Sequence, residues 1–467
     1  MAKNSTQADG EKVRAKRLEQ GWSQSELARK AKVDRGTVAN IESDKTVTRA
    51  KLSNVYRALG LDRQKLICPD LIQVDATPLA IQEHIERFDT YVQEKRRDFK
   101  GRGFVFEAVN HFICQQGQQS GYFVIRGDPG IGKSALLAQL VKEYPHLLNR
   151  PARLIYHFNI ATRGIVTSKR FLENVCAQLI AAFQLPYLQL PDEFDRDGMV
   201  LGRLLGEAAQ LLRNEECLIV AIDALDEVDV GADRPGANPL YLPEVLPQGV
   251  FVIATSRPRE STRFLAANGE DWTLDAGSEE NLKDVGAFIE SWASRKGVQE
   301  WIHKEEWCVA QFVDVMRERS KGNFMYLRHV LSDMNRGSYH DVGATGLPLG
   351  LRAYYRDHWR RMGMTATPLP EAKIRIIYAL STAPVPMRRA RLAYLAEESE
   401  LEVQEVLDEW EEFVSKDASK EPMEYSLYHW SFRDFLERRS VVQAAGISLK
   451  RMNAHIGRTL FDEFFDK

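Results

Sequence analysis

Apolar and polar positions in the middle of the chain alternate in a way that predicts an α/β domain. Four strand-sized runs are rich in β-branched and aromatic residues, and stretches with helical spacing separate them. Strands that alternate with helices form parallel sheets covered by helices. The predicted strands are "GYFVIR" (121–126), "ARLIYHFNI" (152–160), "CLIVAI" (217–222) and "GVFVIATSRP" (249–258).

The N-terminal part has a different pattern, because residues 13–61 predict four or five short helices. Ser23 and Glu26 have the spacing of a capping box, which predicts a helix start at Ser23. Asp34 is suited to cap the next helix. In the connector that follows, residues 79–99 predict one amphipathic helix.

A phosphate-binding loop lies between the first predicted strand and a helix-forming run. The segment "GDPGIGKS" (127–134) fits the pattern G-x-x-x-x-G-K-[ST], in which glycines let backbone N–H groups turn onto phosphates. Lys133 would reach the β- and γ-phosphate oxygens of ATP, and the Ser134 hydroxyl would bind Mg²⁺. The residues predicted to bind ATP or ADP here are Gly127, Gly130, Gly132, Lys133, Ser134 and Ala135.

Acidic residues follow the third predicted strand. Asp223 ends this strand, and Asp226 and Glu227 come just after it. Strand-end carboxylates beside a phosphate loop hold Mg²⁺ and orient the attacking water, so Asp223 is a metal candidate and the other two are catalytic candidates. The alternative is an acidic surface turn. Arg257, at the end of the fourth strand, is a candidate γ-phosphate sensor, with a surface salt bridge as the equal alternative.

Composition and charge limit the class of protein. The 467 residues are 44% hydrophobic and 28% charged, which suits two to four globular domains. The longest apolar runs are strand-sized and the N-terminus has no apolar signal region, so we expect no membrane partner and a cytoplasmic protein. Five scattered cysteines argue against a disulfide framework or a cysteine zinc cluster.

The charge is distributed unevenly along the chain. Residues 1–63 carry 14 Lys and Arg against 8 Asp and Glu, a net charge of +6, whereas the remainder carries −9. A basic module on an acidic body predicts an anionic partner for the N-terminal part alone.

The N-terminal pattern resembles the XRE/Cro-type helix-turn-helix, which implies binding of double-stranded DNA through residues 11–66. The sequence departs from the family at Asp44, where Gly is usual. Gly36 stands at a position that would face base edges, and without a side chain it cannot contact a base. The alternative to DNA binding is that these residues form a helical dimerisation module with a solvated basic face. By resemblance, Gln24 would contact a phosphate, Arg35, Thr37 and Asn40 would face base edges, and Lys45 would add a phosphate contact.

The spacing of acids in "DALDE" (223–227) resembles the NACHT branch of the STAND NTPases, which are AAA+-related switches. Two further segments fit this family: "KGRGFVFEAV" (100–109) resembles the motif over the nucleotide base, and "KGNFMYLRHVL" (321–331) resembles part of the lid. The segment "YSLYHWSFRDFLERR" (425–439) resembles the end of the family's winged helix. From the residues alone, a histidine between Tyr428 and Trp430 is more often a core residue. The resemblance implies instead that His429 touches the β-phosphate of ADP.

The resemblance implies a fold class: an α/β P-loop NTPase domain with a parallel sheet, an N-terminal all-α helix-turn-helix domain, and a C-terminal helical lid plus winged helix. The expected boundaries are 1–10 flexible tail, 11–66 helix-turn-helix domain, 67–98 linker with helix, 99–265 nucleotide-binding domain, 266–345 helical lid, 346–440 winged helix and 441–467 C-terminal helix.

A switch is the function class that these features favour. A P-loop kinase would not need some 170 helical residues after Arg257, and no trans arginine finger of a motor stands out. We therefore expect a slow Mg²⁺-dependent ATPase whose ATP state self-associates. Its output is either transcription regulation through DNA, or sensing of phage infection with the N-terminal module recruiting protein partners.

The trigger of such a switch would be a protein or ligand that the sequence does not identify. Residues 447–465 predict a single helix rather than a sensor repeat array. We therefore expect either that the chain is a fragment or that the trigger is sensed elsewhere.

Overall fold

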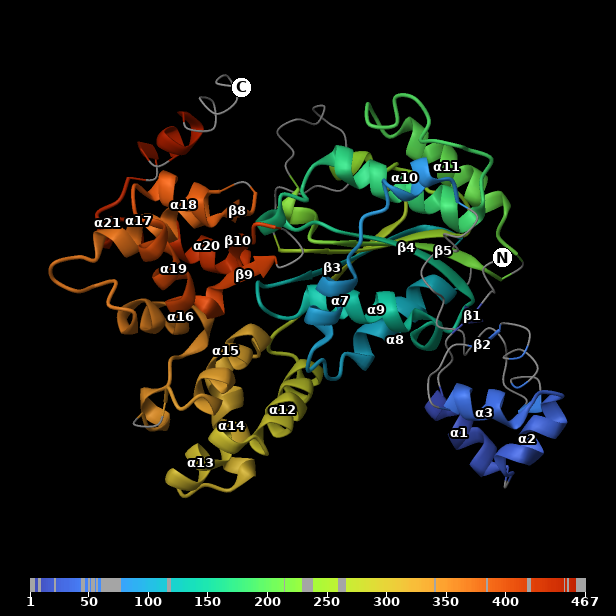
Figure 1. Ribbon diagram of the computed structural model, residues 1–467, viewed down its shortest axis with the longest axis horizontal. Helices are drawn as coiled ribbons and strands as arrows, with labels where there is room; N and C mark the ends of the chain where they lie inside the picture. Colours follow the sequence, from blue (N-terminus) through green and yellow to red (C-terminus); the bar gives the residue numbers. More distant parts are fainter. Residues whose placement is uncertain are drawn as a thin grey trace.

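The computed structural model arranges the chain as a small N-terminal helical part, a central α/β part and a C-terminal helical part (Figure 1). Among the residues it describes, no helix is both long and apolar enough to cross a bilayer. The structure describes residues 5–6, 10–20, 22–42, 47–48, 51, 55, 58–59, 77–115, 119–213, 215–228, 238–258, 266–339, 342–383, 385–417, 421–448, 450–451 and 453–458.

The central part is built on a five-stranded parallel sheet with the order β4-β5-β6-β3-β7. The four strands that the sequence predicts are confirmed, as β3 (Gly121–Gly127), β4 (Ala152–Phe158), β5 (Cys217–Asp223) and β6 (Val250–Ser256). β7 (Gly269–Leu274) is an additional edge strand beside β3, and most of its residues are exposed, so it lacks an apolar run. It follows residue 265, where we expect the nucleotide-binding domain to end.

Helices cover both faces of this sheet (Figure 1). One face packs against α10 (Ser168–Phe183) and α11 (Met199–Gln210), and the other against α8 (Gly103–Cys114) and α9 (Lys133–Leu147). Alternate strand residues serve the two cores, as the two-residue period of a strand requires. Three short 3₁₀ turns lie between these elements. η2 (Ala161–Arg163) follows β4, η3 (Leu225–Glu227) follows β5, and η5 (Pro239–Tyr241) lies in the loop before β6.

The connector before the sheet differs from its expected form. The sequence predicts one helix over residues 79–99, whereas the structure has α6 (Leu79–Gln82) and α7 (Asp89–Arg96) with a break between them. Ile81 packs in the α10 core, and Phe88, just before α7, packs in the α9 core. A continuous helix would not place these residues on opposite faces of the sheet, so the chain breaks as it passes the β4 edge.

The N-terminal part has the helix-turn-helix arrangement, with α1 (Gly10–Glu19), α2 (Gln24–Ala31) and α3 (Arg35–Glu42). Its apolar core includes Val13, Leu27, Val38 and Ile41. The predicted capping box is confirmed, because Ser23 and Glu26 bond reciprocally through side chain and backbone. In addition, β1 (Ser5–Thr6), which lies in the segment expected to be a flexible tail, pairs with β2 (Val47–Thr48).

The C-terminal part joins a helical lid to a winged-helix part around one continuous hydrophobic core. The winged-helix part contains a three-stranded antiparallel sheet of order β8-β10-β9. Of the predicted C-terminal helix, residues 450–451 and 453–458 are helical, and residues 459–467 lie outside the described residues.

The lid comprises α12 (Glu279–Ala293), α13 (Lys296–Lys304), α14 (Val309–Ser320) and α15 (Phe324–Asn335). The turn η6 (Ala344–Gly346) connects it to the winged-helix part, which comprises α16 (Gly350–Arg361), α17 (Glu371–Thr382), β8 (Met387–Arg388), α18 (Arg389–Ala396), α19 (Glu400–Glu409), η7 (Glu411–Phe413), β9 (Val414–Asp417), β10 (Glu424–Leu427), α20 (Trp430–Leu436) and α21 (Arg439–Ala444).

Candidate nucleotide-binding site

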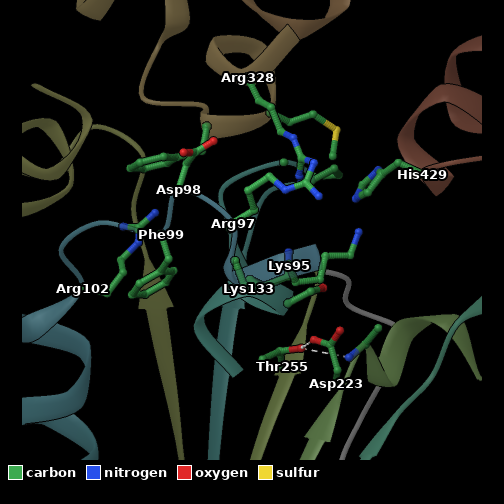
Figure 2. A pocket seen from close by; sticks show the side chains of 18 of the residues that line it. Lys95, Arg97, Asp98, Phe99, Arg102, Lys133, Asp223, Thr255, Arg328 and His429 are labelled. Carbon is green, nitrogen blue, oxygen red and sulfur yellow. Dashed lines mark hydrogen bonds between the residues drawn. The ribbon is translucent and has the colours of Figure 1, made fainter. Parts of the chain in front are cut away.

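A cavity lies at the carboxyl ends of the sheet strands, where the α/β part meets the lid and the winged-helix part (Figure 2). Its volume is about 1050 Å³ when the open solvent at its mouth is included. The loop after β3, the ends of β5 and β6, α7, α15 and the two residues before α20, Tyr428 and His429, all contribute to its wall. The position matches the rule that α/β sheets bind ligands beyond their carboxyl edge.

The predicted phosphate loop forms one wall of this cavity. Gly130 and Gly132 have φ angles of 83° and 102°, the left-handed region that favours glycine. Lys133 begins α9, and its Nζ donates to the carbonyl oxygens of Gly127 at 2.6 Å and Asp128 at 3.1 Å. Five of the six predicted nucleotide ligands line the cavity: Gly130, Gly132, Lys133, Ser134 and Ala135. The sixth, Gly127, is the last residue of β3 and is not among the lining residues.

Asp223 lies at the floor of the cavity and fits the role of a metal ligand. Its side chain is 1% exposed, and Oδ1 accepts a 2.5 Å hydrogen bond from the Thr255 hydroxyl. Oδ2 is buried and has no hydrogen-bond partner among the described residues. Burial raises the pKa of Asp223, and the hydrogen bond from Thr255 acts in the opposite direction. An unpartnered buried oxygen beside the Ser134 hydroxyl is the oxygen donor set that Mg²⁺ prefers.

Glu227 lies close to this site in η3. Its Oε2 accepts a 3.0 Å hydrogen bond from the backbone N–H of Ala161. Burial raises the pKa of Glu227 to about 7, with nearby Asp226 and Asp223 adding to the shift. A carboxyl group with a pKa near neutrality is suited to accept a proton from water.

Arg257 connects the sheet to the winged-helix part. Its Nε pairs with Asp226 Oδ2 at 3.0 Å, its backbone N–H donates to Asp226 Oδ1 at 2.9 Å, and Nη1 pairs with Asp434 on α20. The guanidinium is therefore shared by two carboxylates in this structure. The catalytic role of Asp226 and the γ-phosphate contact of Arg257 stay predictions.

His429 lines the cavity from the winged-helix side, as the residue that caps α20 (Figure 2). Its Nδ1 accepts the backbone N–H of Ser431 at 3.0 Å, which assigns the ring proton to Nε2. Burial lowers the pKa of His429 well below its usual value, and the positive charges of Lys95, Arg257 and Lys133 lower it further. The imidazole is therefore neutral, with one N–H available as a donor.

The lid contacts the phosphate loop directly. The backbone N–H of Met325 donates to Gly130 O at 3.0 Å, and Asn323 Nδ2 donates to Pro129 O at 2.8 Å. Buried Arg102, in the "KGRG" segment, donates to Ile131 O at 2.5 Å and to Asn281 Oδ1 on α12 at 2.6 Å. A change in the loop's conformation would therefore act on the lid.

Sequence reasoning missed several side chains at this site. Lys95 on α7 and Arg328 on α15 line the cavity, and their charged groups lie 4.6 and 5.4 Å from the Tyr428 ring centre. Tyr91 on α7 lies close to the acidic residues of the site, because burial and the charges of Asp223 and Glu227 raise its pKa. Within "TYVQEKRRDF" (90–99), nothing distinguishes Tyr91 and Lys95 from residues on a solvated helix face.

The predicted DNA-contacting residues fall into different environments. Arg35 and Asn40 are exposed on α3. Gln24 is half-buried, and its Nε2 donates to Glu42 Oε2 at 2.8 Å. Thr37 differs from the expectation that it faces base edges: it is 4% exposed, and its hydroxyl donates to Asp34 Oδ2 at 2.7 Å as part of the helix cap. Lys45 lies outside the described residues.

Comparisons with known proteins match two regions of the chain. Residues 13–66 match the family model described as Helix-turn-helix, and residues 107–257 match the one described as Nephrocystin 3, N-terminal. NACHT domain- and WD repeat-containing protein 1 is 27% identical in Mus musculus and 28% identical in Homo sapiens over 135 residues. The aligned stretch covers 28% of this chain and only 8% of each relative.

Among solved structures, Cdc6p from Pyrobaculum aerophilum is 10% identical, with a TM-score of 0.31, and the match covers 83% of this chain and 97% of that one.

The fold and the phosphate loop define a P-loop NTPase. More narrowly, the chain carries a NACHT-type nucleotide-binding region preceded by an XRE-type helix-turn-helix domain.

Replacing Lys133 with Ala removes the only ammonium group of the phosphate loop itself, among the residues that the structure describes. We expect ADP and ATP affinity to fall more than about 30-fold, because loss of one partner of a buried charge pair costs roughly 2–5 kcal/mol. Isothermal titration calorimetry measures this change. Lys142→Ala, on the same helix but paired with Asp89 at the surface, is the matched control. Equal affinities of Lys133→Ala and wild type would refute the assignment.

Proposed function

We propose that the protein is a nucleotide-operated switch: ADP holds a closed form, and ATP releases the winged-helix part so that the protein self-associates and binds double-stranded DNA more tightly. The observation that carries this proposal is that α20 and its cap residue each contact the nucleotide-binding region. His429, which caps α20, lines the cavity together with the phosphate loop, and Asp434 on α20 pairs with Arg257 at the end of β6. The position of this one short helix therefore depends both on what occupies the cavity and on the ion pair with Arg257.

Nucleotide phosphates would interact with the loop glycines, with Lys133 and with the Nε2 proton of His429. The γ-phosphate of ATP would compete with Asp434 for the Arg257 guanidinium, since both are anions. Only a difference in affinity between the two forms shifts such an equilibrium, and ADP lacks the group that would displace Asp434. Loss of this ion pair would free α20, and the surfaces that it exposes would associate.

Hydrolysis would return the switch to its closed form. Ser134 and Asp223 are the residues that would hold Mg²⁺, and the ion when bound neutralises charge on the phosphate oxygens. Glu227 would accept a proton from the attacking water. We propose a slow ATPase, because a signal must outlast one turnover.

The DNA output is proposed from the charge and the exposed face of the N-terminal part. A module with a net charge of +6 binds DNA weakly alone, with a salt dependence set by a few phosphate contacts. Self-association would bring two copies onto one duplex, and effective concentration then raises the avidity. Thr37 is buried and Gly36 has no side chain, so fewer side chains can contact bases. This favours, as the second candidate output, the recruitment of protein partners in phage sensing.

The proposed base role of Glu227 predicts how hydrolysis depends on pH. The ionised carboxylate is the active form and its pKa is raised to about 7, so kcat/KM for ATP should fall about tenfold per pH unit below 7 and level off above it. Steady-state rates between pH 5.5 and 8.5 test this. Glu227→Gln should bind ATP normally and lose most of the rate together with this pH dependence. A flat profile in wild type would exclude Glu227 as the base.

DNA binding tests the proposed output. Fluorescence anisotropy of labelled duplexes, at one fixed salt concentration, should give at least about tenfold tighter binding with ATP than with ADP. The preferred duplex should contain paired half-sites about one helical turn apart. Arg35→Ala should reduce discrimination between duplex sequences, whereas Lys45→Ala should weaken binding to all of them about equally.

Equal affinity of the ADP and ATP forms would separate DNA binding from the switch. No affinity in either form would leave residues 11–66 as a protein-interaction module.

A further inference from the structure

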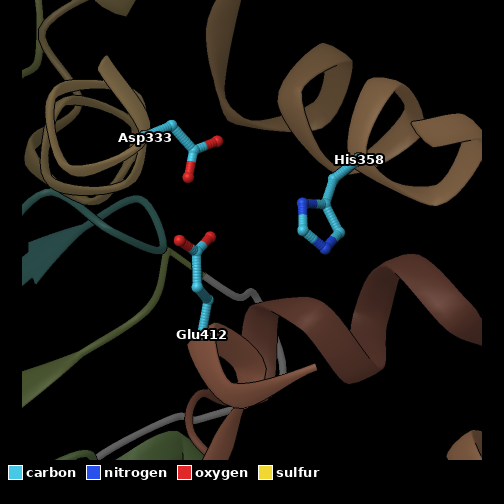
Figure 3. A group of neighbouring side chains, drawn as sticks. All are labelled: Asp333, His358 and Glu412. Carbon is cyan, nitrogen blue, oxygen red and sulfur yellow. The ribbon is translucent and has the colours of Figure 1, made fainter. Parts of the chain in front are cut away.

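Three potential metal ligands meet where the lid joins the winged-helix part (Figure 3). Asp333 comes from α15, His358 from α16 and Glu412 from η7. One ligand atom of each lies within 4.8 Å of those of the other two. Asp333 and His358 are 2% and 4% exposed, and the Glu412 side chain is 15% exposed. The cluster lies outside the nucleotide-binding cavity, since none of its residues lines that cavity.

His358 is the unusual member of this cluster. Both of its ring nitrogens are buried without a hydrogen-bond partner among the described residues. Its ring packs against Trp410 and Phe413, with ring centres 5.3 and 4.5 Å away, and Figure 3 shows the ring directed toward the two carboxylates. Burying an imidazole without a partner costs free energy. Burial also lowers the pKa of His358 to about 3, so the ring is neutral, the form that binds metals.

The two carboxylates add to this imbalance. Burial and the neighbouring Asp333 raise the pKa of Glu412. Two carboxylates in contact repel each other unless a proton or a cation lies between them. A bound cation would relieve this repulsion and would also give His358 a partner, whereas a shared proton would leave His358 unpartnered.

Surrounding groups hold the carboxylates in place. The Tyr354 hydroxyl lies 3.3 Å from Asp333 Oδ2 and 3.1 Å from Glu412 Oε2. Arg361 Nη2 donates to Asp333 at 3.0 Å, and Arg336 Nη1 donates to Glu412 at 2.5 Å. The two arginine side chains are 32% and 55% exposed, so solvent screens their charges. Such outer hydrogen bonds orient the ligands of metal sites.

We propose that Asp333, His358 and Glu412 form a binding site for a divalent transition metal, of which Zn²⁺ fits the donor set best. One imidazole nitrogen and two carboxylate oxygens suit Zn²⁺, and the imidazole disfavours Mg²⁺ and Ca²⁺. The fourth position would be taken by water. The ion would fasten α15 of the lid to α16 and η7 of the winged-helix part. This site is independent of the nucleotide switch proposed above.

Metal titration of the full chain tests this proposal. Chelator-treated protein, with excess Mg²⁺ and ADP to occupy the nucleotide site, is titrated with Zn²⁺ by calorimetry and with Co²⁺ by visible absorption. We expect one equivalent to bind, d–d bands that indicate a nitrogen ligand, and a melting temperature raised by several degrees, because a ligand that binds only the folded state stabilises it.

Substitutions identify the ligands. His358→Phe keeps an aromatic ring against Trp410 and Phe413 but removes the nitrogens, so it should fold and lower Zn²⁺ affinity about 100-fold or more. Glu412→Gln should also weaken binding, as a second variant if His358→Phe fails to fold. His329→Phe is the matched control: His329 is buried beside the same Phe413 ring but is not part of the cluster.

The control should bind Zn²⁺ like wild type. Absence of binding by wild type would overturn the proposal and leave Asp333 and Glu412 as a proton-sharing pair. Binding that is unchanged in both His358→Phe and Glu412→Gln would overturn it as well.

Discussion

The position of the Arg257 guanidinium between Asp226 and Asp434 is the contact on which the closed arrangement depends. Asp226 follows β5 in the α/β part and Asp434 belongs to α20 in the winged-helix part, so one side chain joins two parts of the chain at the mouth of the cavity. The Arg257 side chain is 9% exposed, and a buried charge without a partner of opposite charge is strongly destabilising. Any ligand that brings negative charge to Arg257 competes with Asp434. The lid's hydrogen bonds to Gly130 and Pro129 tie a third part to the same place.

Much of the site could be predicted from the sequence, because its chemistry is local. Lys133, Ser134 and the glycines of the loop belong to one short segment, and Asp223 ends an obvious buried strand. A phosphate loop and strand-end acids need only their neighbours to adopt their geometry. The role of His429 is predicted only from the resemblance, because nothing within "YHWSF" distinguishes an imidazole that lines a cavity from one that packs in the core.

Other features depend on contacts distant in the sequence. Asp434 lies 177 residues from Arg257, and no local pattern pairs them. β7 escapes prediction because an edge strand with exposed side chains has no apolar run. The helix predicted over 79–99 is broken by tertiary packing, since Ile81 and Phe88 enter cores on opposite faces of the sheet. Thr37 has a spacing suited to base contact, yet its hydroxyl bonds to Asp34 at the start of α3 and its side chain is buried.

The central claim is that α20 and its cap residue His429 move away from the nucleotide-binding cavity when ATP replaces ADP, and an interdomain distance tests it most directly. Exposed Cys114 on α8 and a cysteine placed at exposed Leu401 on α19 can carry spin labels, with Cys68 and Cys308 replaced by Ser. Glu227→Gln keeps ATP intact during measurement by pulsed electron paramagnetic resonance. The account predicts one narrow distance distribution with ADP and a longer, separate one with ATP. The same distribution with both nucleotides would contradict it.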